Sequence, residues 1–461
     1  MIRLDLALTP ALLKAQLDRV FELSAAKIRS LAQSWDPATG SPVITVRGVY
    51  TTRDWADWTQ GFQFGSALLQ FDVTGDTWFL NQGRRNILAW MPKHLTNVGG
   101  HDHGFTIIGT YGNLLRLVCE GKIDADDYEA EYYKLALRIS GAVQAARWTN
   151  LPGTGYIHSF HGPQSLFVNS IRSLRSLGVA HRLGHVLMGE GDKRINLLDR
   201  LVQHASLTAR YAVFYGEGRD HYDVRGRVAH ECIFNVTNGT YRCTAAQQGF
   251  SPFTTWTRGL AWAMLGFAEQ LEFLAELPSE ELGPLGGRAA IEAMMRGAAE
   301  ATCDYYIELA PTDDIPYWDT AAPGLVRMGA YQDRRSDPYN EYEPVDSSAA
   351  AAAAQGLWRL GTCLKSVPGA SVRSERYRQS ALVIAKTLFN RPYLSEDPSH
   401  QGLILHAIYN RPGGWDHVAS GHKVPRGESA MWGDYHALEL ALLLLRDLRG
   451  ETYPTFFRVC R

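Results

Sequence analysis

The chain has 461 residues, of which 45% are hydrophobic and 20% are charged. This balance is typical of a globular protein with a large buried core and excludes a disordered or fibrous chain. Lys and Arg total 46 against 48 Asp and Glu, and no basic run is present, so we expect no nucleic-acid partner. No apolar stretch is long enough for a membrane span or a signal peptide, so we expect no membrane partner either.

The first predicted element is an amphipathic helix over residues 11–33. Thr9 is a suitable N-cap, and Pro10 suits the first helical position. Helical periodicity continues along the chain, whereas strand-like alternation is rare. We expect further helices over residues 127–146, 165–187, 193–215, 257–274, 288–309, 347–364, 374–390 and 430–448. Long loops rich in Gly, Pro and Asp, such as 220–251 and 311–344, are where function is expected on such a scaffold.

No linker, charge block or shift in composition divides the chain, so we predict one all-α domain over residues 1–461. Many helices in succession can pair into an (α/α) barrel, a ring of inner and outer helices around a cleft. The segment DSSAAAAAAQGLWRLG fits an inner helix, because small side chains allow close approach. Asp346 or Ser347 would cap this helix. The alanines also suit any helix by propensity alone, which does not exclude the packing role.

Six cysteines stand alone, without the CxxC or Cys/His spacing of a zinc site. We interpret all six as reduced thiols and the protein as cytoplasmic. Glycosylation sequons begin at Asn235 and Asn238 and would matter only in a secreted chain.

The tripeptide His101-Asp102-His103 lies inside the glycine-rich segment GGHDHGF. It leaves three interpretations open: a metal site, a polar turn before a helix, or a carboxylate held at the rim of a cleft. The metal site is the least favoured, because a zinc ion needs more ligands than this segment supplies. Phosphate-binding loops, dinucleotide-binding glycine motifs, nucleophile elbows and HExxH are all absent from the sequence.

Five segments are individually weak but specific in their order along the chain. They are DWTQGFQFG from Asp57, GGHDHGF from Gly99, QQGF with TWTRGLAWAMLGF between Gln247 and Phe267, IPYWDT with EPVDSSAAAAAA from Ile315, and WGDYHALELALL from Trp432. Together they resemble the unsaturated glucuronyl hydrolases of glycoside hydrolase family 88 and, more distantly, the unsaturated rhamnogalacturonyl hydrolases of family 105. The resemblance implies an (α/α)6 barrel, in agreement with the helical pattern.

The resemblance also implies a reaction. Members of the family remove a 4,5-unsaturated uronic acid from the non-reducing end of oligosaccharides made by polysaccharide lyases. Protonation of C4 gives an oxocarbenium-like centre at C5, water adds there, and the hemiketal collapses to release the remaining sugar. One cleft carboxyl supplies the general acid–base catalysis, so we expect neither a cofactor nor a metal. We expect that oligosaccharide as the partner, and a monomer or homodimer.

By the same resemblance, Asp102 is the first of two cleft aspartates. The family's second aspartate opens a helix, and in FVNSIRSL that position holds Asn169. An amide has nearly the shape of a carboxylate but no dissociable proton at neutral pH. Three explanations stay open: an inactivated variant, a natural member with other chemistry, or a different alignment of this helix. We favour the first, because the surrounding helix is otherwise intact.

Further positions match residues that contact the sugar in the family. His230 and Gln248 match contacts to the unsaturated sugar and its water, while Arg258 and Trp262 would share one helix face. A Trp at helical spacing is more often core than ligand, and an Arg beside it often completes only a cation–π pair. The substrate-binding residues implied are Trp58, His101, His230, Gln248, Arg258 and Trp262. Three other aspartates, Asp319, Asp346 and Asp434, are expected to shape loops and cap helices.

Two other functions stay open. A saturated uronidase or a polysaccharide lyase on the same ring would cleave saturated substrate or raise the ultraviolet absorbance. A non-catalytic sugar-binding protein would keep Asn169 as its native residue and show binding without turnover. The parent polysaccharide and the tolerance of sulfate groups are not predicted by any motif.

Overall fold

The computed structural model describes residues 4–53 and 57–460. The amino-terminal helix begins as predicted: the Thr9 side chain accepts a hydrogen bond from the Leu12 amide, and Pro10 opens a 3-10 turn (Pro10–Leu13). Helix α1 (Lys14–Ser34) follows and buries one apolar face.

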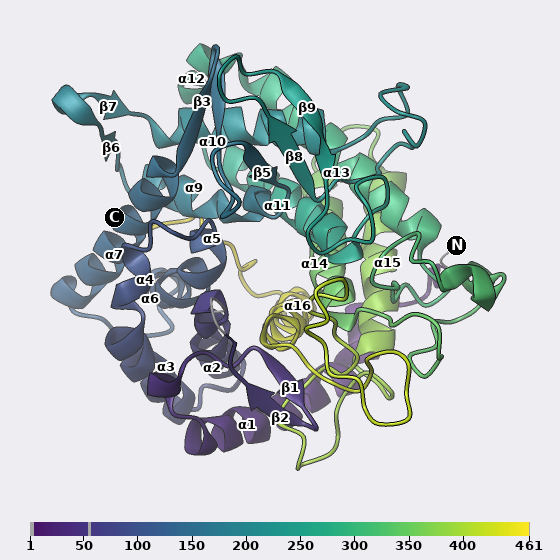
Figure 1. The fold of residues 1–461 in the computed structure, drawn as a ribbon. Coiled ribbons are helices and arrows are strands. Elements are labelled where there is room, and N and C mark those ends of the chain that lie inside the picture. The colour runs from purple at the N-terminus through teal and green to yellow at the C-terminus, as the bar shows by residue number, and fades with distance from the viewer. Residues whose placement is uncertain (1–3, 54–56, 461) are drawn as a thin grey trace.

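The helices of the described residues alternate between an outer and an inner ring, which gives an α/α barrel (Figure 1). The outer helices are α1, α3 (Thr77–Trp90), α7 (Asp127–Ala146), α10 (Leu197–Leu207), α13 (Arg288–Leu309) and α15 (Ser371–Leu388). The inner segments are α2 (Gln60–Thr74), α5 with α6 (His103–Thr106, Asn113–Cys119), α8 with α9 (Ser170–Ser173, Arg175–Arg182), α11 (Thr257–Ala275), α14 (Ser347–Leu364) and α16 (Met431–Arg449). Short helices α4 (Pro92–Leu95) and α12 (Ser279–Leu282) lie in connections. The predicted all-α barrel is confirmed.

The alanine-rich helix α14 occupies the inner position that its sequence predicts. It is buried along almost its whole length, and the Asp346 side chain caps it by accepting hydrogen bonds from the Ser348 and Ala349 amides. A Cβ atom at Gly356 would lie 2.8 Å from the Leu265 backbone nitrogen of α11. Small residues therefore allow the close approach of α11 and α14.

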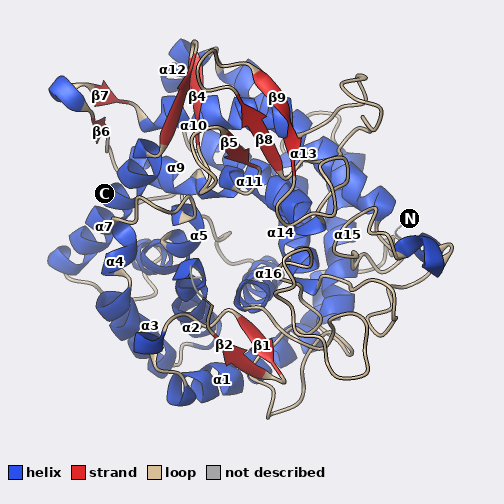
Figure 2. Cartoon of the chain, in the orientation of Figure 1, coloured by secondary structure: helices blue, strands red, loops and turns tan. Residues whose placement is uncertain are grey.

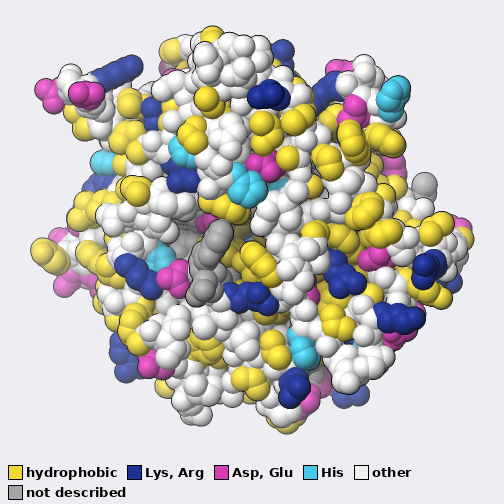
Figure 3. Space-filling model, viewed as in Figure 1, with side chains coloured by type: hydrophobic (Ala, Val, Ile, Leu, Met, Phe, Trp, Pro, Cys, Tyr) yellow, Lys and Arg dark blue, Asp and Glu magenta, His cyan; other side chains and the backbone are white. Residues whose placement is uncertain are grey.

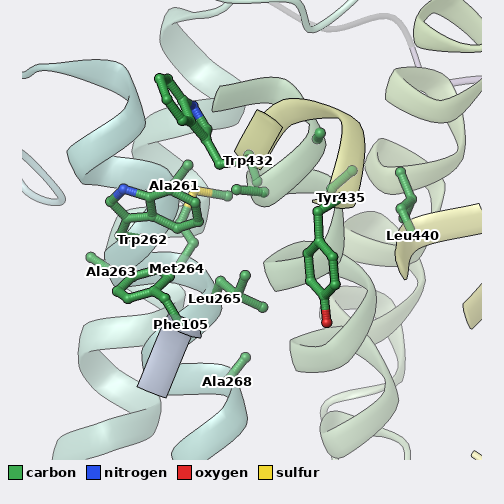
Figure 4. Packing of buried hydrophobic residues seen from close by; sticks show 14 of the residues in the cluster. Phe105, Ala261, Trp262, Ala263, Met264, Leu265, Ala268, Trp432, Tyr435 and Leu440 are labelled. Carbon is green, nitrogen blue, oxygen red and sulfur yellow. The ribbon is translucent and has the colours of Figure 1, made fainter. Parts of the chain in front are cut away.

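Aromatic side chains fill the middle of the ring. Figure 4 shows Trp262 of α11 next to Phe105 of α5, with Trp432 and Tyr435 projecting from α16. The ring centroids of Phe105 and Trp262 lie 5.1 Å apart at 75°, an edge-to-face contact that suits the aromatic quadrupoles.

Short strands lie in the connections between helices (Figure 2). They form the hairpins β1–β2 (Ile44–Val46, Val49–Thr51), β3–β4 (Trp148–Leu151, Thr154–Ile157) and β6–β7 (Leu187–Met188, Arg194–Ile195), and a three-stranded antiparallel sheet in the order β5 (Ser165–Phe167), β8 (Glu231–Phe234), β9 (Tyr241–Ala245). The helix predicted over 165–187 is therefore wrong at both ends, and the helix over 193–215 begins at Leu197. The loop predicted over 220–251 contains β8 and β9, because residues 165–167 pair with residues 231–233.

The prediction that all six cysteines are thiols is wrong. Cys119, at the end of α6, and Cys460 form a disulfide with an S–S distance of 2.07 Å. The other four, Cys232, Cys243, Cys303 and Cys363, are free. Disulfides persist mainly in oxidising compartments, so the cytoplasmic location stays a prediction that this bond does not support. Within the described residues, every helix is too short or too polar to cross a bilayer.

Candidate active site

A cavity of about 610 Å³ opens at the end of the barrel where α2, α5, α8 and α11 begin. Figure 3 shows this face, which is hollowed near its middle and carries interspersed acidic and basic side chains. The volume is within the range of small-molecule sites. Seven of the eight predicted site residues line it: Trp58, His101, Asp102, Asn169, Gln248, Arg258 and Trp262. The eighth, His230, does not.

Asp102 occupies the turn that starts α5. Its backbone oxygen accepts hydrogen bonds from the Phe105 and Thr106 amides, while its side chain caps nothing. Asp102 lines the cavity, and its side chain keeps 26% of its exposure. Of the three interpretations of the tripeptide, the structure supports both the turn before a helix and the carboxylate at a cleft.

The two histidines beside Asp102 are buried and differ in their partners. His103 contacts the Ser140 hydroxyl at 3.0 Å and the Asn97 backbone oxygen at 2.9 Å. His101 has no hydrogen-bond partner on either ring nitrogen, although Nε2 lies 3.7 Å from Asp102 Oδ1. Burial lowers the pKa of both rings, so both are neutral at pH 7. Among the described residues, no group of three or more His, Cys, Asp or Glu side chains is arranged to hold a metal ion.

Asn169 lies between β5 and α8, where its backbone oxygen accepts a hydrogen bond from the Arg172 amide. The preceding residue, Val168, donates its amide hydrogen bond to the His230 backbone oxygen, which fixes the turn. Asn169 Oδ1 is buried without a hydrogen-bond partner and borders the cavity. A buried unpaired acceptor costs about 1–3 kcal/mol, so this atom is suited to accept a hydrogen bond from a bound ligand.

A buried ion-pair network lies behind the cavity wall. Arg172 of α8 pairs with Glu269 of α11 and Glu439 of α16, and Arg175 also pairs with Glu269. The Arg172 guanidinium carbon lies 5.4 Å from the Phe105 ring and 5.7 Å from the Trp262 ring, and both rings line the cavity. Through Arg172, the network therefore connects helix α8, which follows Asn169, to the rings of Phe105 and Trp262 in the cavity lining.

His230 lies behind the wall of the cavity, between the rings of Phe167 and Trp256 at 4.6 and 4.7 Å. Its Nδ1 accepts hydrogen bonds from the Gln247 and Gln248 amides at 3.0 and 3.3 Å. Burial lowers the pKa of His230 to about 3, so the ring stays neutral and Nδ1 remains an acceptor. The predicted direct contact between His230 and the sugar does not agree with this placement.

Arg258 and Trp262 share one face of α11, as their spacing predicts, and both are almost fully buried. Trp262 lines the cavity although it is only 3% exposed. Trp58 stacks on Trp432, with centroids 5.3 Å apart and planes 25° apart, and is only half-buried. Trp58 is therefore the more accessible of the two predicted tryptophans.

The sequence prediction missed several residues of the cavity. Arg53, Phe160, Gln247, Tyr409 and Trp415 also line it. Phe160 keeps 41% of its exposure and stacks on His101, with centroids 5.8 Å apart. Tyr409 and Trp415 could have been predicted as cavity residues, because each is an aromatic residue in a long loop.

The three predicted structural aspartates have structural roles. Asp319 accepts hydrogen bonds from the Phe250 and Ala321 amides, and Asp434 accepts them from the Leu403 and Ile404 amides. Asp346 caps α14.

Comparison with protein-family models finds no match. An unsaturated glucuronyl hydrolase of Formosa agariphila is 24% identical over 387 residues, which cover 83% of this chain and 78% of that protein. An unsaturated glucuronyl hydrolase of Bacillus sp. (strain GL1) is 25% identical over 407 residues, 88% of this chain and 90% of that protein.

Solved structures agree with these relatives. The crystal structure of the unsaturated glucuronyl hydrolase of Bacillus sp. GL1 superposes with a TM-score of 0.70 and 21% identity, over 95% of this chain and 98% of that chain. A structure described as an Asp-to-Asn variant of UGL with dGlcA-Glc-Rha-Glc gives a TM-score of 0.71 at 21% identity, over 97% and 100% of the two chains. These comparisons confirm the resemblance that the motifs predict: the chain is a distant relative of the unsaturated glucuronyl hydrolases and has their α/α-barrel fold.

Proposed function

We propose that this protein is a glycoside hydrolase that removes the 4,5-unsaturated uronic acid from the non-reducing end of lyase-generated oligosaccharides. The observation that carries the proposal is the placement of Asp102 and Asn169 on one cavity, as the family's two cleft aspartates require. The names of the relatives, and the dGlcA-containing oligosaccharide in a solved neighbour, support an oligosaccharide with a terminal unsaturated uronic acid as the partner.

The cavity suits this substrate chemically. Trp58 and Phe160 offer aromatic surface, which matches the apolar faces of a sugar ring. The unpaired side-chain oxygens of Asn169 and Gln247 can accept hydrogen bonds from sugar hydroxyls, and the ring nitrogen of His101 that carries the proton can donate to a hydroxyl or carboxylate oxygen. The site therefore combines aromatic surface with a few polar groups, as is usual for small-ligand sites.

In the reaction, a carboxyl group protonates C4 of the enol ether and water adds to C5. The water loses a proton to the resulting carboxylate, and the hemiketal then opens to free the remaining sugar. A carboxyl group at position 169 would have a pKa raised by burial, as suits a general acid near neutral pH. Asn169 can bind the sugar but cannot donate this proton, so we propose that the chain with Asn169 binds substrate and turns it over about 10²–10⁴-fold more slowly.

We also propose that residues 1–461 form one catalytic domain. The hydrophobic core runs without interruption through α1, α11 and α16, which supports this proposal. The monomer or homodimer remains a prediction.

Calorimetry tests the proposal with the chain as it stands. We expect a lyase-generated unsaturated disaccharide to bind, and its saturated counterpart, which has a different ring shape at C4 and C5, to bind at least about tenfold more weakly. Equal binding of the two would favour a saturated uronidase, and binding of neither would contradict the proposal. Ser399→Ala, in an exposed turn of a loop outside the cavity, is the control and should bind as the parent does.

A further inference from the structure

Arg258 lines the cavity, yet its guanidinium group is committed to the protein. Nη1 donates to Asp346 Oδ2 at 3.0 Å and to the Ile408 backbone oxygen. Nη2 donates to Gln248 Oε1 at 2.8 Å and to the Tyr409 backbone oxygen at 2.5 Å. The side chain is 3% exposed. Recognition of a carboxylate by an arginine commonly uses two parallel N–H groups, and all four Nη–H groups are already engaged here.

These contacts fix the orientation of the Gln248 side chain. A glutamine amide can turn either its oxygen or its NH2 group toward a neighbour, and only the oxygen can accept from a guanidinium. Arg258 therefore holds Oε1 inward, which leaves Nε2 as the part of the amide that is free to donate. Gln248 borders the cavity, so its NH2 group is the donor on this part of the wall.

His230 holds the same residue from the other side. Its neutral ring accepts the backbone amides of Gln247 and Gln248 at Nδ1, and its own position is fixed between Phe167 and Trp256. The backbone and the side chain of Gln248 are thus anchored separately. His230, which does not line the cavity, holds the backbone, and the two terminal nitrogens of Arg258, both engaged by the protein, hold the side chain.

We propose that Arg258 and His230 are positioning residues that act through Gln248, whose Nε2 donates a hydrogen bond to an oxygen of the terminal uronic acid. This inference rests on the proposed function for the identity of the ligand. It replaces the expectation that Arg258 and His230 contact the sugar themselves. Arg258 joins the loop that carries Gln248 to the α14 N-cap and to the loop that carries Tyr409, so one side chain connects two segments of the cavity wall to a capped inner helix.

A double-mutant cycle tests the proposal by binding, because Asn169 keeps the ligand uncleaved. Gln248→Ala and Arg258→Lys should each weaken the affinity for a lyase-generated unsaturated disaccharide by about two- to tenfold. The double variant should be no weaker than Gln248→Ala alone, because Arg258 acts through the amide that this variant lacks. Multiplying effects of the two substitutions would overturn the proposal, since they would show an independent contact between Arg258 and the sugar.

A crystal structure of Arg258→Lys gives a test that needs no ligand and so separates this inference from the proposed function. We expect the Gln248 side chain to leave its position, because a lysine cannot bridge Asp346, Gln248 and Tyr409 at once. An unchanged Gln248 amide in that variant would overturn the proposal. Failure of every unsaturated disaccharide to bind the parent, together with a displaced amide in Arg258→Lys, would contradict the proposed function alone.

Discussion

Arg172 Nε and Glu269 Oε2 lie 3.3 Å apart at the centre of the barrel, where neither side chain is more than 2% exposed. Glu269 also accepts from Arg175 at 3.1 Å, so one carboxylate bridges two buried guanidinium groups, and Glu439 supplies the second carboxylate of the network. Removal of one partner of a buried pair leaves an uncompensated charge, which costs about 3–5 kcal/mol.

We therefore expect Glu269→Gln to lower the free energy of unfolding by about 3–5 kcal/mol in urea denaturation. The matched control is Asp18→Asn, which removes the exposed pair between Lys14 and Asp18 and should change stability by less than about 1 kcal/mol. Similar small effects of both substitutions would show that the buried network does not stabilise the ring.

The contact between α11 and α14 depends on the absence of a side chain at Gly356. Gly356→Ala places a Cβ 2.8 Å from the Leu265 backbone nitrogen and should destabilise the protein by about 1–3 kcal/mol. Gly297→Ala on the outer helix α13 meets no atom within 4 Å and should stabilise it by about 0.5–1 kcal/mol. Thermal denaturation of the two variants checks this opposite response, and equal responses would contradict the inner and outer assignment.

The disulfide is expected to hold the carboxyl-terminal segment against α6. Alkylation without a reducing agent, followed by peptide mass spectrometry, should recover Cys119 and Cys460 as one cross-linked pair and the other four cysteines as labelled thiols. Cys460→Ser should lower the free energy of unfolding by about 2–4 kcal/mol, whereas Cys243→Ser, at an exposed position, should change it by less than about 0.5 kcal/mol. Labelling of all six cysteines would instead restore the prediction of reduced thiols.

The buried ring of His204 gives the protein a defined response to acid. Its Nδ1 accepts a hydrogen bond from the Ile157 amide at 3.1 Å, and burial lowers its pKa to about 3 from an ordinary value of 6.5. Below about pH 6.5 the unfolded chain therefore binds a proton at this ring that the folded chain does not, so stability falls as the pH falls.

We expect the parent to lose about 3 kcal/mol more than His204→Gln between about pH 7 and about pH 4, since the other titrating groups are common to both. Urea denaturation across this pH range measures the difference. Parallel pH profiles for the two proteins would rule out this role of the His204 ring.

Sequence patterns predicted the helices best where the periodicity is long and the packing is local. The helices over 127–146, 288–309 and 347–364 are confirmed to the residue. The helix over 165–187 is wrong because its first residues pair with a strand more than sixty residues further along the chain. Helices α2 and α3 were missed, because their glycine and aromatic residues weaken the helical pattern.

For the cavity too, the sequence predicted what depends on local motifs and did not predict contacts between distant segments of the chain. Motifs identified Asp102 and the Asn169 position, because their roles follow from residue type and order. They did not predict that both Nη groups of Arg258 are engaged by Asp346, Gln248 and two carbonyl groups, since distant segments of the chain supply those partners. The direction in which the His230 ring faces likewise depends on Phe167 and Trp256, which pack against it from other elements.

The most direct test of the central claim is the turnover of Asn169→Asp, followed by the ultraviolet absorbance of the C4=C5 bond. We expect this variant to bleach the absorbance of a lyase-generated oligosaccharide about 10²–10⁴-fold faster than the parent, and Asp102→Asn in the same background to lose most of that gain. Tight binding of the oligosaccharide without any bleaching by Asn169→Asp would contradict the claim, because it would leave a protein that recognises the sugar and does not hydrate it.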